Sequence, residues 1–155
     1  MHEQVQSSVP GIIGISHARR MRPEGSWLQI HTEKILIVDD DDTYRRSLSK
    51  VFEKAGFNVS VAVNALNAFE LLTQNQYALV LVDVPKPYQG GLEMLQTLLS
   101  KCGASRVIVL TTFGEKSLLE QVSAKGVSEC LIKPLKRNDI LDAVDRTLHK
   151  DDSQK

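Results

Sequence analysis

From residue 34 onward, short apolar segments alternate with amphipathic ones. The segments whose apolar or alternating pattern is typical of strands lie at 35–38, 57–63, 78–82, 107–110 and 129–132. After each of them, apolar residues recur three and four positions apart, which is the period of an amphipathic helix. These helical stripes lie at 48–55, 65–72, 92–99, 118–122 and 140–148. The pattern therefore predicts five strand–helix units in succession.

Strands that alternate with helices predict an α/β fold, with parallel strands joined by right-handed crossovers and helices on both faces of the sheet. The first, third and fourth strands are apolar throughout, as strands buried on both faces must be. The second strand alternates and the fifth is short, which indicates edge positions. We therefore expect a doubly wound (βα)5 parallel sheet, flavodoxin-like, with strand order 2-1-3-4-5.

The first part of the chain differs from the rest. Residues 1–32 sustain no periodicity, and we expect a disordered leader there, although an arm that docks a partner is an alternative reading. Because Met21 lies inside this segment, an assigned start that is too early is a further alternative. We expect one folded domain at 33–149, followed by a short tail at 150–155.

The composition of the chain excludes several classes of function. The chain has 155 residues, of which 42% are hydrophobic, and its 19 basic residues balance its 19 acidic ones. This balance argues against nucleic-acid binding through bulk charge. The only two cysteines, Cys102 and Cys130, exclude a disulfide scaffold and suggest reduced thiols. Because the apolar runs are too short to span a bilayer and the start lacks signal-peptide features, we expect a cytoplasmic protein without membrane contact.

Charged and hydroxyl side chains follow the predicted strands. The first strand ends at Asp39–Asp42, the third at Asp83, the fourth at Thr111 and the fifth at Lys133. Because the carboxyl ends of parallel strands meet at one edge of the sheet, we expect these groups on one rim. Asp41 and Asp42 immediately precede a helix, so N-capping is the better interpretation for these two.

The gathered charges predict a chemistry. Two carboxylates about 4 Å apart repel by roughly 4 kcal/mol at an effective dielectric constant of about 20, so a cation is needed among them. A few hard oxygen ligands favour Mg²⁺, which also accepts phosphate oxygens. A carboxylate beside Mg²⁺ and Lys133 can attack a phosphoryl group and form an acyl phosphate. Taken singly, each residue has an ordinary structural interpretation, but their placement at four strand ends favours a site.

At these residues the sequence resembles the receiver domain of two-component response regulators, over about residues 33–149. The matching segments are 35–40, 79–83 with Pro87, 91–93, 107–111 and 133–134. Each segment alone is weak evidence for the family, whereas all of them together, in this order and at this spacing, are a specific signal. The resemblance implies that a histidine kinase or phosphotransfer protein passes a phosphoryl group to Asp83, and that an unknown downstream protein reads the signal.

The resemblance also implies the ligands of Mg²⁺. Asp40 and Asp83 would bind the ion through their carboxylates, and Pro85 through its backbone carbonyl. Asp39 would help to hold the ion through water. A receiver of this kind catalyses its own phosphorylation and dephosphorylation and is not a metabolic enzyme.

Further roles follow from the same resemblance. Lys133 would pair with phosphoryl oxygens and Thr111 would donate a hydrogen bond to one of them. A cis peptide bond is expected at Lys133-Pro134. The kinase would dock around the first helix near its aromatic and basic residues, Tyr44, Arg45 and Arg46.

Two other functions compete with a working receiver. A degenerate receiver would signal by docking without phosphorylation, and the departures at Cys130 and Pro85 keep this reading open. In the family a Tyr or Phe that couples to the threonine usually stands where this chain has Cys130. A flavodoxin-like cofactor binder would need a phosphate-cradling loop after the first strand, where the aspartates of this chain would repel a phosphate.

We predict altered, slow self-dephosphorylation. Pro85 offers no polar side chain to orient a water molecule, Lys86 replaces a common Met, and Thr112 replaces a usual small residue. The check is the hydrolysis half-life of the phosphorylated chain, and a half-life like that of a typical receiver would contradict the prediction.

Overall fold

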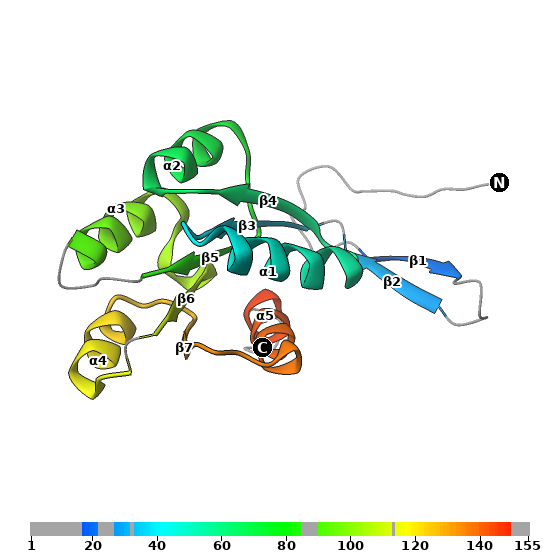
Figure 1. Cartoon of the computed structure of the whole chain (residues 1–155). Helices are drawn as coiled ribbons and strands as arrows, with labels where there is room; N and C mark the ends of the chain where they lie inside the picture. Colours follow the sequence, from blue (N-terminus) through cyan, green and yellow to red (C-terminus); the bar gives the residue numbers. More distant parts are fainter. Residues whose placement is uncertain (1–16, 22–26, 32, 85–89, 113, 150–155) are drawn as a thin grey trace.

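The computed structural model describes residues 17–21, 27–31, 33–84, 90–112 and 114–149 (Figure 1). The strands are β1 (His17–Met21), β2 (Trp27–His31), β3 (Lys34–Val38), β4 (Asn58–Ala62), β5 (Leu79–Asp83), β6 (Val107–Thr111) and β7 (Glu129–Ile132). The helices are α1 (Asp42–Lys54), α2 (Ala65–Gln74), α3 (Leu92–Cys102), α4 (Lys116–Ala124) and α5 (Arg137–Leu148), with a 3₁₀ turn, η2, at Ala104–Arg106. Every strand and helix predicted from residue 34 onward is present.

A five-stranded parallel sheet forms the centre of the molecule, in the order β4-β3-β5-β6-β7. Counted within this sheet, the order is 2-1-3-4-5, as the sequence predicts. The edges also agree with the prediction, because β4 and the short β7 are only partly buried, unlike the strands between them. The three central strands, β3, β5 and β6, are buried along almost their whole length.

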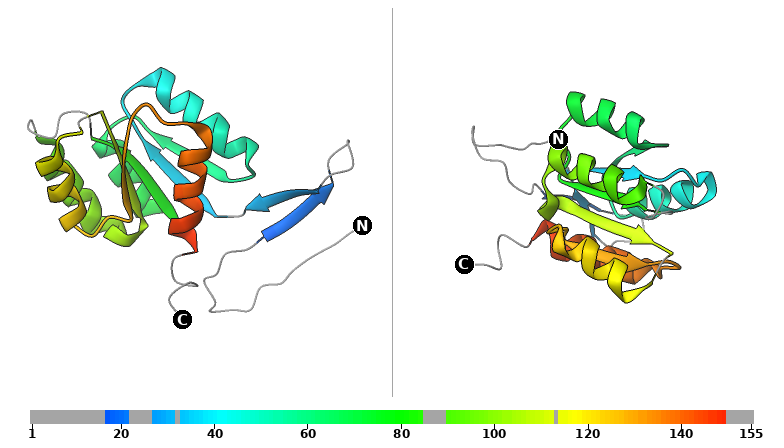
Figure 2. Two further views of the ribbon diagram at one scale, coloured as in Figure 1. Left: turned by 90° about the horizontal axis from the view of Figure 1, so that it is seen from below. Right: turned by 90° about the vertical axis from the view of Figure 1, so that its left-hand side faces the viewer.

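Two apolar clusters cover the two faces of the sheet, because successive strand residues point to opposite sides. On one face, Leu36, Val80 and Val109 pack beneath α2, α3 and α4. On the other, Ile37 and Leu81 pack beneath α1 and α5. Figure 2 shows this arrangement, with α3 and α4 on one side of the strands and α1 and α5 on the other.

Local signals set the ends of the first helices. Asp41 is the N-cap of α1, and its carboxylate accepts a hydrogen bond from the backbone N–H of Tyr44 at 3.1 Å. Asp42 lies in the first turn, where a negative charge interacts favourably with the helix dipole. Gly56, at φ 100°, follows the end of α1, where only a residue without a side chain adopts this conformation freely. The capping interpretation of Asp41 is therefore confirmed.

The hairpin of β1 and β2 was not expected from the sequence. These strands pair antiparallel, from His17 opposite His31 to Met21 opposite Trp27, and form a separate two-stranded sheet. We expected a disordered leader over 1–32, and the hairpin differs from that expectation. Residues 1–16 and the tail after 149 lie outside the described residues, so both assignments stay predictions there.

None of the helices among the described residues combines the length and the apolar character needed to cross a membrane.

We predict that Phe52→Ala lowers the free energy of unfolding by about 3–5 kcal/mol, because it leaves a cavity in the core. Phe52 is fully buried, and its ring centroid lies 6.0 Å from that of Phe57 in an edge-to-face arrangement. Urea denaturation gives the measurement. Leu66→Ala is the control, because Leu66 is 69% exposed and its loss should change little. Equal effects of the two changes would contradict the assigned core.

Candidate functional site

Backbone hydrogen bonds continue past the ends of the strands and place the site residues. The N–H of Asp39 donates to the carbonyl of Ala62 at 3.1 Å, which keeps the end of β3 against β4. The N–H of Val84 donates to the carbonyl of Leu110 at 2.9 Å, and the N–H of Lys133 donates to the backbone carbonyl of Thr111 at 2.8 Å. The residues that follow β3, β5 and β7 are thereby held at one rim of the sheet.

Lys133 lies between two buried carboxylates. Its Nζ is 3.1 Å from Oδ2 of Asp39 and 3.1 Å from Oδ1 of Asp83. The side chain of Lys133 is 11% exposed, and those of Asp39 and Asp83 are 1% and 6% exposed. Because water screens so little at this depth, the ammonium is the main compensation for two negative charges.

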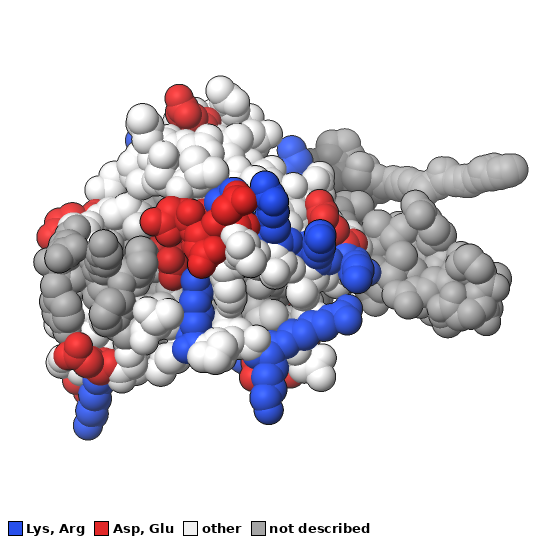
Figure 3. Space-filling model, in the orientation of Figure 1, with Lys and Arg blue, Asp and Glu red and all other residues white. Residues whose placement is uncertain are grey.

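Asp40 completes a cluster of three carboxylates with Asp39 and Asp83. One oxygen from each lies within 4.8 Å of the other two, and Asp40 is the exposed member. Figure 3 shows acidic side chains gathered near the start of α1, with basic side chains beside them. Oxygen donors alone, close together and open to solvent on one side, fit the preference of Mg²⁺ for few carboxylates and retained water.

Thr111 lies beside this cluster and is 2% exposed. Its hydroxyl donates to the carbonyl of Val84 at 3.1 Å, so it touches the backbone that immediately follows Asp83. The sheet therefore brings together Asp39, Asp40, Asp83, Thr111 and Lys133, the set named from the sequence. Pro85 and its neighbours at 86–89 lie outside the described residues. The expected cis peptide bond at Lys133-Pro134 is present.

The first turn of α1 contributes two contacts that the sequence did not reveal. The ring of Tyr44 lies beneath the ammonium of Lys133, with 3.9 Å between Nζ and the ring centroid. Arg45 donates to the backbone carbonyl of Asp39 at 3.0 Å, also pairs with Asp42, and its side chain is only 11% exposed. Both residues had been expected only as docking residues, because no sequence pattern shows that α1 contacts Lys133 or the carbonyl of Asp39.

The electrostatics of the pocket follow from burial. Burial first, and then the charge of Asp39, raises the pKa of Asp83 to about 6, although Lys133 opposes both. Burial lowers the pKa of Lys133, but its hydrogen bonds and charge interactions with Asp39 and Asp83 outweigh this and the pKa rises. The ammonium therefore stays charged at neutral pH.

Cys130 stands on β7 opposite Val109 of β6. It is half-buried, packs against the cluster beneath α2, α3 and α4, and burial raises the pKa of its thiol. A cysteine side chain is much smaller than the aromatic side chain that the resemblance places here. A ring that moves toward Thr111 is therefore not available from this position.

The comparisons with known proteins agree with this geometry. The sequence model of the response regulator receiver domain matches residues 35–145. The chain belongs to this family. Sporulation initiation phosphotransferase F of Bacillus subtilis is similar to this receiver, with 35% identity over 116 residues, which are 75% of this chain and 94% of that protein.

A second relative is longer than this chain. Transcriptional regulatory protein SrrA of Staphylococcus aureus is 30% identical over 122 residues, which are 79% of this chain and 50% of that protein. The receiver described here thus spans half the length of that relative.

Solved structures share the fold. A response regulator from Thermotoga maritima matches with a TM-score of 0.68 and 26% identity, covering 76% of this chain and 98% of that one. A receiver domain protein from Methanospirillum hungatei matches with a TM-score of 0.71 over 80% of this chain and 99% of that one. Because its identity is 22%, this second likeness shows the fold alone.

We predict that Asp83→Asn stabilises the metal-free receiver at pH 7. Folding raises the pKa of Asp83 from 3.8 to about 6, so the native chain binds a proton more tightly than the unfolded chain. Stability then falls as the pH rises from about 4 to about 6, and the loss is complete above that window. Asparagine removes this cost, which is up to about 3 kcal/mol at pH 7, and its amide oxygen can still accept from Lys133.

Denaturation in chelator from pH 4 to pH 8 gives the measurement. The gain from Asp83→Asn should shrink toward pH 4, where the native carboxyl is protonated. Glu120→Gln, on an exposed position of α4, is the control and should follow the wild type at every pH. A gain from Asp83→Asn that does not change with pH would contradict the assignment.

Proposed function

We propose that this receiver accepts a phosphoryl group on Asp83 from the phosphohistidine of a histidine kinase or phosphotransfer protein, in a Mg²⁺-dependent reaction. One observation carries the proposal: the ammonium of Lys133 bonds Asp39 and Asp83 at once, with Asp40 beside them. A structural ion pair needs one carboxylate for one ammonium. Three carboxylates around one ammonium leave negative charge that a divalent cation can balance.

The reaction assigned to Asp83 is a displacement at phosphorus. A carboxylate oxygen of Asp83 forms a bond to phosphorus, while the bond from phosphorus to the donor's leaving atom breaks and the leaving group keeps the electron pair. The product is an acyl phosphate, and the donor imidazole leaves as a neutral ring because its other nitrogen carries a proton. At neutral pH, above the raised pKa of about 6, most Asp83 is ionised and can act as the nucleophile.

The other groups of the site would neutralise the charge of the phosphoryl group and orient it for transfer. Asp40 and Asp83 would hold Mg²⁺ through their carboxylates, Asp39 would assist through water, and the carbonyl of Pro85 is the further proposed ligand. When bound, the ion balances negative charge on the phosphoryl oxygens. Lys133 lies 3.1 Å from the proposed nucleophile and would pair with an oxygen of the new phosphoryl group.

Thr111 would report the reaction. Its hydroxyl now donates to the carbonyl of Val84. We propose that it turns to a phosphoryl oxygen after transfer and so releases the backbone that follows Asp83. Because Cys130 is too small to follow such a movement as an aromatic ring would, the downstream protein would have to sense this backbone and its surroundings.

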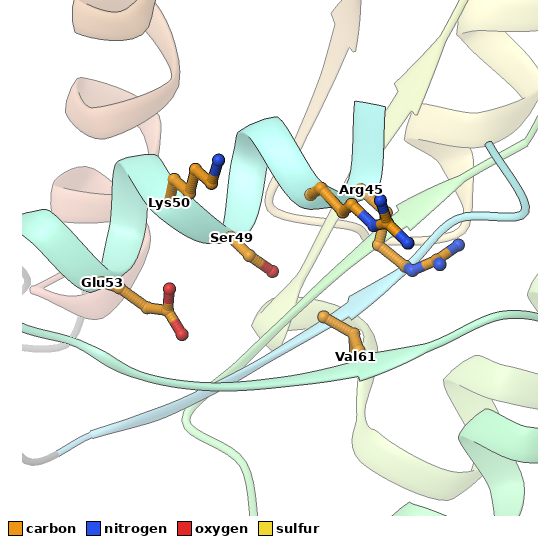
Figure 4. Close-up of a pocket in the computed structure, with 6 residues that line it drawn as sticks. Arg45, Ser49, Lys50, Glu53 and Val61 are labelled. Carbon is orange, nitrogen blue, oxygen red and sulfur yellow. The ribbon is translucent and has the colours of Figure 1, made fainter. Parts of the chain in front are cut away.

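We propose that the phosphodonor protein docks on α1. Arg46 is an accessible cation there, since its side chain is 75% exposed and pairs with Asp42 at 3.0 Å. Figure 4 shows the neighbouring pocket between α1 and β4, with Ser49 and Glu53 directed toward Val61. The Bacillus subtilis relative is named as a phosphotransferase, which supports a place for this receiver in a phosphorelay.

The same proposal places the receiver in the cytoplasm. Cys102 and Cys130 are both free thiols, as expected in a reducing compartment. Signalling would then proceed through protein contacts, without direct binding of this domain to nucleic acid or membrane.

A degenerate receiver is the second candidate. The observation that favours it is Cys130, which occupies a half-buried position on β7 without the volume of an aromatic switch. Such a chain would fold around the same carboxylates but signal by docking alone.

We predict that incubation with Mg²⁺ and acetyl phosphate adds one phosphoryl group to the intact mass of the wild-type chain. Asp83→Ala and removal of Mg²⁺ with a chelator should both abolish the addition. Asp42→Ala is the matched control, because Asp42 is an exposed carboxylate near the same rim and should leave phosphorylation intact. A folded wild type that gains no mass would favour the degenerate receiver.

A further inference from the structure

Tyr44 occupies a place that the proposed chemistry does not explain. It lies in the first turn of α1, whereas Lys133 follows β7 at the far edge of the sheet. Even so, Nζ of Lys133 is 3.9 Å from the centroid of the Tyr44 ring, which is within cation–π distance.

The ammonium of Lys133 therefore has three partners of two kinds. Asp39 and Asp83 each lie 3.1 Å from Nζ, and the face of the Tyr44 ring closes a further side. The aliphatic stem and ammonium are nearly buried, with 11% of the side chain exposed. A cation–π contact strengthens as the cation loses water, so burial makes this one matter more than a surface pair would.

The ring is held in place independently of Lys133. The backbone N–H of Tyr44 donates to the capping carboxylate of Asp41 at 3.1 Å, and the next residue, Arg45, donates to the carbonyl of Asp39 at 3.0 Å. The side chain also packs against the apolar cluster beneath α1 and α5. Tyr44 is thus a fixed platform, and the flexible lysine is the partner that adapts to it.

The three partners differ in what the proposed reaction does to them. Phosphorylation converts the carboxylate of Asp83 into an acyl phosphate, and a bound cation would share the charge of Asp39. Both anionic partners of Lys133 are therefore changed during a cycle, whereas the ring is not. An ammonium held by the carboxylates alone would exchange its partners during transfer, before it pairs with the new phosphoryl group.

We propose that Tyr44 is a positioning residue that keeps the ammonium of Lys133 beside Asp83 while the phosphoryl group is transferred. This role rests on the proposed phosphoacceptor function. It acts through Lys133, since the ring donates nothing to the reaction itself. It is also separate from protein docking on α1, and a small phosphodonor tests it without a docking partner.

The contact itself can be tested by NMR on the metal-free chain. The ε-methylene protons of Lys133 should be shifted upfield by the ring current of Tyr44. Tyr44→Phe should keep this shift because it keeps the ring, whereas Tyr44→Leu and Tyr44→Met should abolish it. An unshifted Lys133 signal in the wild type would overturn the proposal whatever the activity shows.

The role is tested by the rate of phosphorylation with acetyl phosphate at saturating Mg²⁺. We expect Tyr44→Leu and Tyr44→Met to lower the maximal rate about fivefold, the effect of one cation–π contact, and Tyr44→Phe to restore it. Phe69→Leu on α2 is the matched control, because it removes a partly buried ring from the opposite apolar cluster and should leave the rate unchanged. Thermal unfolding confirms that each variant is folded.

A second background separates positioning from packing. In chains that carry Lys133→Met, adding Tyr44→Leu should cause no further loss, since the ring then has no ammonium to hold. An equal loss in both backgrounds would show that the ring acts through packing and would overturn the proposal. If the wild type is phosphorylated and Tyr44→Leu is phosphorylated at the same rate, this role alone is overturned. If the wild type takes up no phosphoryl group, the proposed function is overturned and this role with it.

Discussion

The site depends on one buried ammonium shared by two buried carboxylates. The side chains of Asp39 and Asp83 are almost fully buried at the ends of the neighbouring strands β3 and β5, so their repulsion would drive these ends apart. Lys133 bonds both carboxylates at 3.1 Å and joins the end of β7, on the far edge of the sheet, to its centre. The pKa of Asp83 is still raised, first by burial and then by the charge of Asp39. A divalent cation would balance the remaining negative charge of this cluster.

The parallel sheet turns this charge arrangement into a rigid site. Its central strands are buried on both faces, and the ladder of hydrogen bonds extends past the strand ends to Asp39, Val84 and Lys133. The loops that carry the charged groups therefore begin from fixed backbone positions. Thr111 adds a bond to the carbonyl of Val84, so its hydroxyl already contacts the backbone next to Asp83.

Much of this could be read from the sequence because its signals are local. Strands buried on both faces must be apolar throughout, as residues 79–82 are, and such runs also identify the centre of the sheet. The order of strands in turn predicted which strand ends meet, and hence the set that includes Asp83 and Lys133. The hairpin of β1 and β2 escaped because the leader shows no sustained alternation. The contact of Tyr44 with Lys133 escaped because it joins segments that are distant in the chain. The contact of Arg45 with the carbonyl of Asp39 spans only six residues, but no periodicity or capping pattern indicates it.

The sequence by itself determined the (βα)5 order, the apolar stripe of each helix and the identity of the groups at the strand ends, because periodicity and capping act within a few residues. It could not determine how those groups share their partners. Whether Lys133 would bond one carboxylate or two, or lie over a ring, depends on distances between β3, β5, β7 and α1. Those distances are set by the packing of helices on the two faces of the sheet, which is a property of the whole fold. The tertiary structure alone therefore decided that one ammonium serves two acids and an aromatic face.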